Sequence, residues 1–236
     1  MRKIVFSLLV FGLFGCAEMQ QVMDQLPQGT TGISQFEIGN GLKEALNNGI
    51  TKQVSKLTAT DGFFKNQAVK ILLPEELQVV DKKLRQIGLS SLADEGLKVL
   101  NRAAEDAVKE ATPIFVDAIT SMSIMDAKNI VMGHDSSATQ YLQSNTSQAL
   151  YNKFYPVVKN SFSKVGADDI WKKIFTTYNA IPFIQKINPD LNDYVTNQAL
   201  SGVFKMITVE EKEIRTNFNA RTTDLLKRVF ALQDKK

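Results

Sequence analysis

Residues 34–57 read SQFEIGNGLKEALNNGITKQVSKL, and this stretch predicts a long helix with one apolar face. Ser34 is followed three residues later by Glu37, which is the spacing of a capping box at the start of a helix. Apolar residues then recur at steps of three and four residues, at Leu42, Leu46, Ile50, Val54 and Leu57. Because such a face has to be buried against other elements, the stretch favours a domain built from packed helices.

The rest of the chain continues the helical pattern. Further helices are expected at residues 74–87, 90–122, 124–132, 136–165, 167–180, 190–207, 209–216 and 220–232. Gly88 should end the first of these helices, while Pro113 and Pro156 should kink or split two others because proline has no N–H to donate. Only residues 69–73 could be extended, since Pro74 disfavours helix just before it. We therefore predict an all-α, single, bundle-like domain over residues 34–236, with at most one short extended segment near 69–73.

The chain begins with MRKIVFSLLVFGLFGC, which has the features of an export signal that ends in a lipid-attachment site. The apolar run at residues 4–14 is shorter than the roughly 20 residues that span a bilayer, so residues 1–15 are expected to be a cleaved signal peptide. The stretch LFGC resembles the bacterial lipobox, in which the cysteine is acylated, although Phe14 departs from the usual small or β-branched residue. We predict lipidation at Cys16; the alternative is an apolar N-terminus with an incidental cysteine.

Residues 16–33 are expected to form a flexible tether, because Gln, Pro, Gly and Thr dominate and the apolar positions have no sustained period. Fully extended, a tether of this length reaches about 55 Å. An acylated Cys16 would hold the chain on the membrane of the bacterial cell envelope without a transmembrane helix. Ala17, rather than an aspartate, follows the cysteine, which favours the outer membrane facing the periplasm. Since Cys16 is the one cysteine, the folded part is expected to have no disulfide.

The charge balance argues against nucleic acid as a partner. The formal net charge is +3, and removal of residues 1–15 takes away Arg2 and Lys3, which leaves 26 basic against 25 acidic residues. Nucleic-acid-binding proteins usually carry a concentrated basic face. With one histidine and one cysteine in the chain, neither a metal site nor a cofactor is expected.

The single histidine lies in NIVMGHDSSATQYL, residues 129–142. Gly133 stands where a left-handed glycine ends a helix, and Asp135 or Ser136 stands where the next helix needs an N-cap. On this interpretation His134 fills a turn between two helices. The alternatives are a ligand contact or a catalytic role, but a catalytic serine would be expected in a G-x-S-x-G elbow, which this stretch does not contain.

Two charged groupings are the remaining candidates for a binding site. They are Asn101, Arg102 and Glu105 in NRAAE, and Glu211, Arg215 and Arg221 in the 210–221 stretch. One interpretation is that they form solvated pairs on helix surfaces, each worth about 0.2–0.5 kcal/mol. The other is that they meet in a partly buried polar network, which would support the fold or bind an anionic head group. The amphipathic C-terminal helix could likewise pack on the core or lie on a membrane.

Seven stretches together resemble one known family. They are GLKEAL (41–46), NRAAE (101–105), DAKNIVMG (126–133), SATQY (137–141), DLNDYVTNQALSGVF (190–204), EEKEIR (210–215) and ARTTDLLKRVF (220–230). The family consists of bacterial lipoproteins known only as a domain of unknown function. The resemblance implies an exported, lipid-anchored, mainly helical protein, and it transfers no activity, cofactor or catalytic residue.

These observations favour a non-enzymatic envelope lipoprotein whose helical domain binds an envelope protein or a small anionic or apolar ligand. One alternative is an enzyme of unrecognised type that uses arginines and carboxylates from the 101–106 and 210–221 stretches. A convergence of these two stretches on a charged cavity would favour it. The other alternative is a purely structural role in an assembly.

Overall fold

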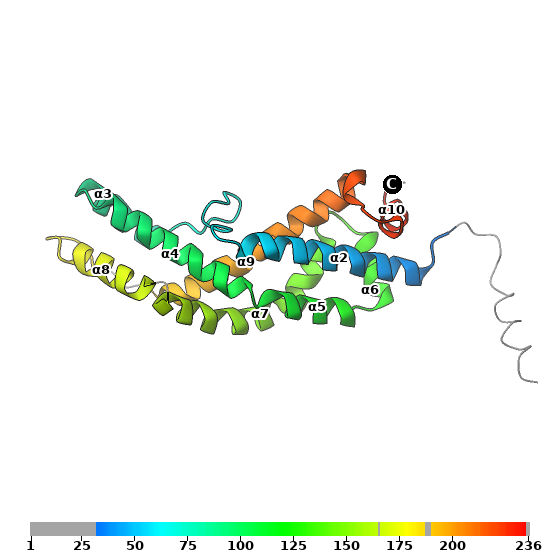
Figure 1. Ribbon diagram of the computed structural model, residues 1–236, viewed down its shortest axis with the longest axis horizontal. Helices are drawn as coiled ribbons and strands as arrows, with labels where there is room; N and C mark the ends of the chain where they lie inside the picture. Colours follow the sequence, from blue (N-terminus) through cyan, green and yellow to red (C-terminus); the bar gives the residue numbers. More distant parts are fainter. Residues whose placement is uncertain (1–31, 165, 187–189, 235–236) are drawn as a thin grey trace, which may run out of the picture. The chain divides into compact units, whose positions relative to one another are not determined.

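The computed structural model describes residues 32–164, 166–186 and 190–234. The helices over these ranges are α2 (Gln35–Thr58), α3 (Glu75–Gln86), α4 (Ser90–Val108), α5 (Ala111–Ser121), α6 (Ile124–Val131), α7 (Ser137–Lys164), α8 (Ala167–Asn179), α9 (Leu191–Thr216), the 3-10 turn η1 (Phe218–Ala220) and α10 (Asp224–Phe230) (Figure 1). The described ranges contain no strand, which confirms the all-α prediction. The expected signal peptide (1–15), Cys16 and the tether up to residue 31 lie outside the described residues.

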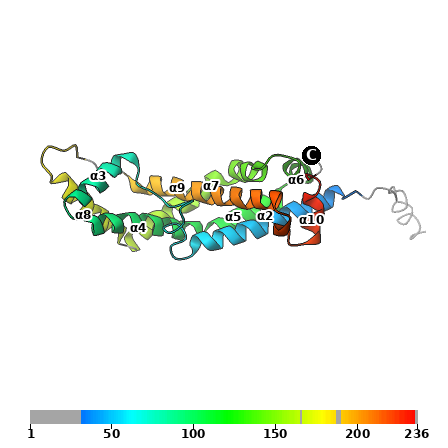
Figure 2. The same ribbon diagram turned by 90° about the horizontal axis from the view of Figure 1, so that it is seen from above.

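Helices α7 and α9 lie against each other in opposite directions, and α4 packs on both of them (Figures 1 and 2). Helix α2 packs on α9 and is covered by α5, α6 and α10, while α8 and α3 pack on α4. The core lies along these helix contacts. It is formed by side chains that are less than 2% exposed, among them Phe63, Leu100, Phe115, Phe154 and Phe230. One helical unit therefore runs from Ser34 to the end of the chain.

Helix α2 forms as its sequence predicts. Ser34 Oγ accepts the Glu37 N–H at 3.1 Å, and the Glu37 carboxylate accepts the Ser34 N–H at 3.0 Å. The five apolar residues at three- and four-residue steps are all buried. A second capping box, between Ser123 and Asp126, starts α6. Both helix starts therefore depend on contacts across three residues.

The remaining helix ends show which predictions needed tertiary information. The chain leaves α4 at Lys109 and re-enters a helix at Ala111, so it splits just before Pro113, as predicted. Helix α7 continues through Pro156. The helices expected at 190–207 and 209–216 are one continuous helix, α9, capped by Asp190.

Residues 69–73 do not form a strand. The side chain of Asn101 on α4 accepts the N–H of Ile71 at 2.8 Å and donates to its carbonyl at 3.0 Å. Both backbone groups that a neighbouring strand would use are therefore taken by a side chain. The segment expected to be extended lies outside the helices, as a loop that is held to α4 through the buried Ile71.

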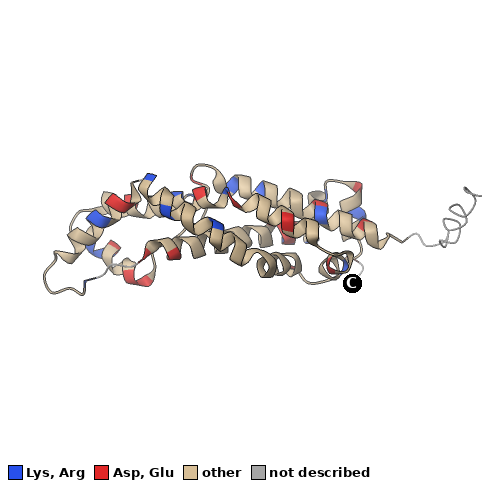
Figure 3. Ribbon diagram, turned by 90° about the horizontal axis from the view of Figure 1, so that it is seen from below, with Lys and Arg blue, Asp and Glu red and all other residues tan. Residues whose placement is uncertain are grey.

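Charged residues of both signs are interspersed over the helices (Figure 3). The C-terminal helix α10 packs on the core, because Leu226, Val229 and Phe230 are buried. Among the described residues, no helix combines the length and apolarity that crossing a membrane requires.

Candidate functional site

A buried ion pair on α9 is the centre of the largest polar network. Arg215 Nη2 lies 2.9 Å from Glu211 Oε1, one turn away on the same helix. Both side chains are less than 5% exposed. The interpretation of this pair as a solvated surface contact is therefore wrong, because the end of α6, the start of α7 and the C-terminal segment at Gln233 bind it.

Glu211 also caps the start of α7. Its two carboxylate oxygens accept the backbone N–H groups of Ala138 and Thr139, each at 2.8 Å, and the Thr139 hydroxyl at 2.8 Å. Ala138 and Thr139 are the second and third residues of α7, whose N–H groups an N-cap side chain normally satisfies. Ser136 occupies the N-cap position, as expected, since its carbonyl accepts the Gln140 N–H at 2.9 Å, but the side chain that caps the helix is Glu211 of α9.

Arg215 holds the end of α6 in a matching way. Its guanidinium donates to the carbonyls of Ile130 at 2.8 Å and Val131 at 3.1 Å, and to the Gln233 side chain at 2.7 Å. With the two bonds to Glu211, all five N–H donors of the guanidinium are used. The cation thus meets the negative end of α6 and the carboxylate meets the positive end of α7.

Arg221 fastens the C-terminal segment to the end of α9. It is 3% exposed and donates to the carbonyls of Ile214 at 3.0 Å and Arg215 at 2.8 Å. Its two terminal nitrogens also bind both carboxylate oxygens of Asp234. The hydrogen bond from Arg221 lowers the pKa of Asp234, and partial burial opposes this effect only in part.

The corner between α6 and α7 contains His134, as the sequence predicted. The His134 N–H donates to Ser137 Oγ at 2.9 Å, and its ring Nδ1 lies 3.2 Å from Ser136 Oγ. These residues are on the surface. Gly133 is not left-handed, so the expected reason for a glycine is wrong. A Cβ at this position would overlap Ser137 Oγ, so a close approach within the corner requires the glycine.

Asn101, Arg102 and Glu105 form a separate cluster around the loop between α2 and α3. The Glu105 carboxylate accepts the Phe63 N–H at 3.1 Å. The Arg102 guanidinium forms two ion pairs, one with Glu105 at 2.7 Å and one with Asp61 at 2.6 Å. Asp61 has a left-handed backbone, with φ of 67°. Asn101, Arg102 and Glu105 therefore tie this loop to α4 rather than bind α9.

The six predicted residues do not meet in one network. Gly202 of α9 lies against Phe63, beside the first cluster. Arg215 is thirteen residues further along the same helix, which corresponds to about 20 Å at 1.5 Å per residue. The two clusters fasten different parts of the backbone, and the 101–106 and 210–221 stretches do not converge on one cavity.

A groove lies between α2, α9, η1 and α10. Its volume is about 430 Å³. Its apolar walls include Leu42, Leu46, Ile50, Ile207, Leu226 and Phe230, and Glu211 and Arg215 also contribute to its lining. Asn48, Lys52, Glu210, Glu213, Asn217, Asn219 and Thr222 supply the other polar side chains around it, and the Asn217 amide donates to the Glu213 carboxylate at 2.6 Å. The groove is therefore a partly open, mainly apolar site next to the predicted polar residues Glu211 and Arg215.

Two of the charged residues around the groove are already paired. Lys52 Nζ lies 2.6 Å from Glu210 Oε1. The buried amide of Gln53 donates to the other oxygen of Glu210 at 2.5 Å. Glu210 thus holds Lys52 at the edge of the groove.

The aromatic residues of α7 and α8 belong mainly to the core. Phe154, Phe162, Trp171 and Tyr178 are buried, whereas Phe183 is fully exposed. Within the described ranges, no group of three or more histidine, cysteine, aspartate or glutamate side chains is arranged to hold a metal ion.

Comparison with known proteins identifies one related group. A family model described as "Protein of unknown function (DUF4197)" matches residues 32–231. No curated protein and no solved structure matches the chain. The matched range covers the helices of the described residues and the six polar residues singled out from the sequence.

Proposed function

The chain belongs to the DUF4197 family of proteins of unknown function, and we propose that it is a non-enzymatic binding protein for a small, mainly apolar molecule. The observation that carries this proposal is the groove between α2, α9, η1 and α10. Its volume of about 430 Å³ falls in the range of small-molecule sites, roughly 300–1,000 Å³. Apolar walls with a few polar groups at the edge are also typical of such sites.

The polar network favours an uncharged ligand over an anionic one. Arg215 lines the groove, but its five N–H donors are bound to Glu211, Gln233 and two backbone carbonyls. An anion would have to displace these bonds to reach the guanidinium. Lys52, at the edge, is already neutralised by Glu210. The exposed side chains of Asn48 and Asn219 are better placed to bind an uncharged polar end of the ligand.

A binding role rather than catalysis is supported by how the buried carboxylate is used. Both oxygens of Glu211 accept backbone N–H groups of α7, and one also accepts the Arg215 guanidinium. A general base needs a free lone pair directed at the substrate proton. The bonds of Glu211 point instead to the helix ends that it holds in place.

The proposal extends to the location of the protein. We place it in the bacterial cell envelope, with Cys16 acylated and with the outer membrane facing the periplasm preferred. Support comes from the LFGC stretch at residues 13–16 and from the short apolar run before it. Two or three acyl chains on one cysteine would make the attachment durable.

Binding in the groove is tested with N-phenyl-1-naphthylamine, an uncharged apolar fluorophore. We expect saturable binding of one probe per chain. Ala45→Phe places a ring in the groove and should weaken binding at least tenfold, about 1.4 kcal/mol. Thr51→Phe, at an exposed position of the same helix, is the matched control and should bind normally. Equal affinity of the two variants, with circular dichroism showing both folded, would contradict the proposal.

The location is tested separately by Cys16→Ala. This substitution should release the protein from bacterial membranes while leaving its helical spectrum unchanged. Continued fractionation with the membrane would show that something other than an acyl group holds the chain.

A further inference from the structure

Three exposed apolar side chains gather where α2 and α6 begin. Phe36 is 65% exposed, Ile124 45% and Met125 57%. Phe36 and Gly39 share one face of α2 because they are three residues apart. A Cβ at Gly39 would lie 3.8 Å from Ile124 Cγ1, which places the start of α6 against that face. We call Phe36, Ile124 and Met125 the apolar end of the domain.

The groups around the apolar end carry little free charge. Ser34, Gln35, Asn40 and Ser123 are exposed and uncharged. The two carboxylates at this end, Glu37 and Asp126, are bound to the serines that cap their own helices (Ser34 and Ser123). Glu37 also pairs with Arg228 at 3.0 Å. An apolar surface bordered by hydroxyl and amide groups, with Glu37 paired to Arg228 and Asp126 hydrogen-bonded to Ser123, approaches lipid at a smaller desolvation cost than one with unbonded carboxylates.

The position of the apolar end in the chain indicates what covers it. Phe36 lies four residues after Gly32, where the described part of the chain begins, so the chain enters the domain beside this surface. Only fifteen residues separate Cys16 from Gly32. A lipid on Cys16 would therefore hold this end within about 55 Å of the bilayer, whatever the path of the segment.

We propose that Phe36, Ile124 and Met125 insert into the interfacial region of the lipid bilayer and so orient the domain with the starts of α2 and α6 toward the membrane. The inference rests on the proposed attachment at Cys16. The acyl group gives attachment, while the apolar end gives orientation. At such a short range, three weakly inserting side chains suffice because the attachment makes their contact with lipid intramolecular.

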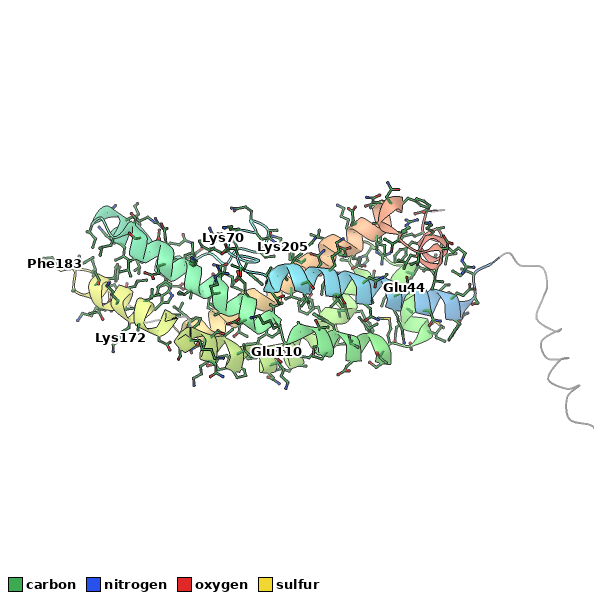
Figure 4. All side chains as sticks on the ribbon, in the orientation of Figure 1. Glu44, Lys70, Glu110, Lys172, Phe183 and Lys205 are labelled. Carbon is green, nitrogen blue, oxygen red and sulfur yellow. The ribbon has the colours of Figure 1, made fainter. Side chains whose placement is uncertain are left out.

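The test uses tryptophan emission from the full chain bound to vesicles of phosphatidylcholine and phosphatidylglycerol with brominated acyl chains. Phe36→Trp places the reporter at the apolar end. Phe183→Trp is the matched control, since Phe183 is fully exposed beyond the end of α8, away from the start of α2 (Figure 4). Trp171 is buried and contributes the same background emission in both variants. The emission of the unsubstituted chain gives the size of this background. We expect roughly twofold quenching at position 36 and almost none at position 183, as for residues in and outside the interface.

Attachment is controlled independently of acylation. A chain with Cys16→Ala and an N-terminal hexahistidine tag is bound to vesicles that contain nickel-chelating lipid. Quenching of Trp at position 36 in this chain supports the orientation even if Cys16 proves not to be acylated. Acylation itself is tested with the chain that keeps Cys16 and has no tag. If Cys16 is not acylated, this chain will not float with vesicles that lack nickel lipid.

Two results would overturn the proposal. One is unquenched emission from position 36 in a chain that is bound to the vesicles. A blue-shifted but unquenched emission would show that protein, either the N-terminal segment or a second copy, covers the surface. The other is equal quenching at positions 36 and 183, which would mean that the domain has no preferred orientation.

Discussion

Glu211 and Arg215, one turn apart on α9, hold the two helix ends of one corner: the carboxylate binds the first amides of α7 and the guanidinium binds the last carbonyls of α6. Their 2.9 Å ion pair joins the two sets of bonds. The pair therefore determines where the chain turns at His134, although neither residue belongs to that turn.

This arrangement predicts an unusual result in a double-mutant cycle. Removal of one member of a buried pair typically costs about 3–5 kcal/mol, whereas replacement of both by apolar residues is often neutral. Here Glu211→Leu with Arg215→Met should remain destabilised by at least about 3 kcal/mol. The reason is that the N–H groups of Ala138 and Thr139 and the carbonyls of Ile130 and Val131 all lose their partners, at about 1–3 kcal/mol for each buried group.

Urea denaturation measures this cycle. The control is the exposed pair Asp224 and Lys227, at 3.2 Å, where replacement of both by alanine should change the free energy of unfolding by less than about 1 kcal/mol. A Glu211→Leu, Arg215→Met chain as stable as the wild type would mean that the corner does not depend on these bonds.

Asn101 is expected to hold the loop between α2 and α3 in place. Asn101→Ala leaves the N–H and the carbonyl of Ile71 without their side-chain partner in a buried site. The expected loss of stability is about 2–4 kcal/mol. Limited proteolysis should also show faster cleavage within residues 59–73. Asn47→Ala, at an exposed position of α2, should change neither measurement.

The same substitution at two glycines should have opposite outcomes. Gly88 has φ of 82°, and no atom lies within 4 Å of the place that a Cβ would take there. Asparagine tolerates this backbone conformation, so Gly88→Asn should keep nearly wild-type stability. Gly133→Asn should lose about 1–3 kcal/mol, because its Cβ would overlap Ser137 in the corner. Thermal unfolding of the two variants gives the comparison, and equal losses would contradict the crowding argument.

Asp234 should make the stability of the fold depend on pH. The hydrogen bond from Arg221 lowers the pKa of Asp234 in the folded protein, so the carboxylate stabilises the fold at any pH above its unfolded pKa of about 3.9. That contribution is lost as the pH falls through the lowered folded value. Asp234→Asn should therefore lower the melting temperature at pH 7, and the difference from the wild type should shrink below about pH 4.

Melting curves followed by circular dichroism from pH 7 to pH 2 measure this difference. Asp135→Asn, at an exposed position in the corner, is the control and should leave the melting temperature almost unchanged across the range. A constant difference between Asp234→Asn and the wild type at all pH values would show that the carboxylate charge is not what stabilises the C-terminal segment.

The predictions that succeeded depend on contacts close in sequence. The predicted capping box of α2 joins residues three apart, and the apolar face of α2 repeats with the period of the helix itself. The break between α4 and α5 follows from the missing N–H of Pro113. Each of these features is decided within one or two helical turns, so the order of residues is enough to find it.

The predictions that failed involve partners far apart in sequence. Glu211 caps α7 across 72 and 73 residues, and its spacing from Arg215 is equally compatible with a solvated surface pair. The contact of Asn101 with Ile71, across 30 residues, was beyond what the local pattern could predict, although the non-helical segment that it holds was expected. No periodicity distinguishes these roles. The tertiary packing decides which helix end lies next to a given side chain, and therefore which side chain caps that end.

The sequence by itself determined that the described part of this protein is all-α, where α2 and α6 start and that one corner surrounds its single histidine, because these features are satisfied within one or two helical turns. Only the tertiary structure decided what the charged residues do. Burial removes water as a competing partner, so each arginine and glutamate must bond to whatever backbone the packing leaves unsatisfied. For that reason six residues expected in one site are divided between two clusters that hold the fold together, with an apolar groove beside one of them.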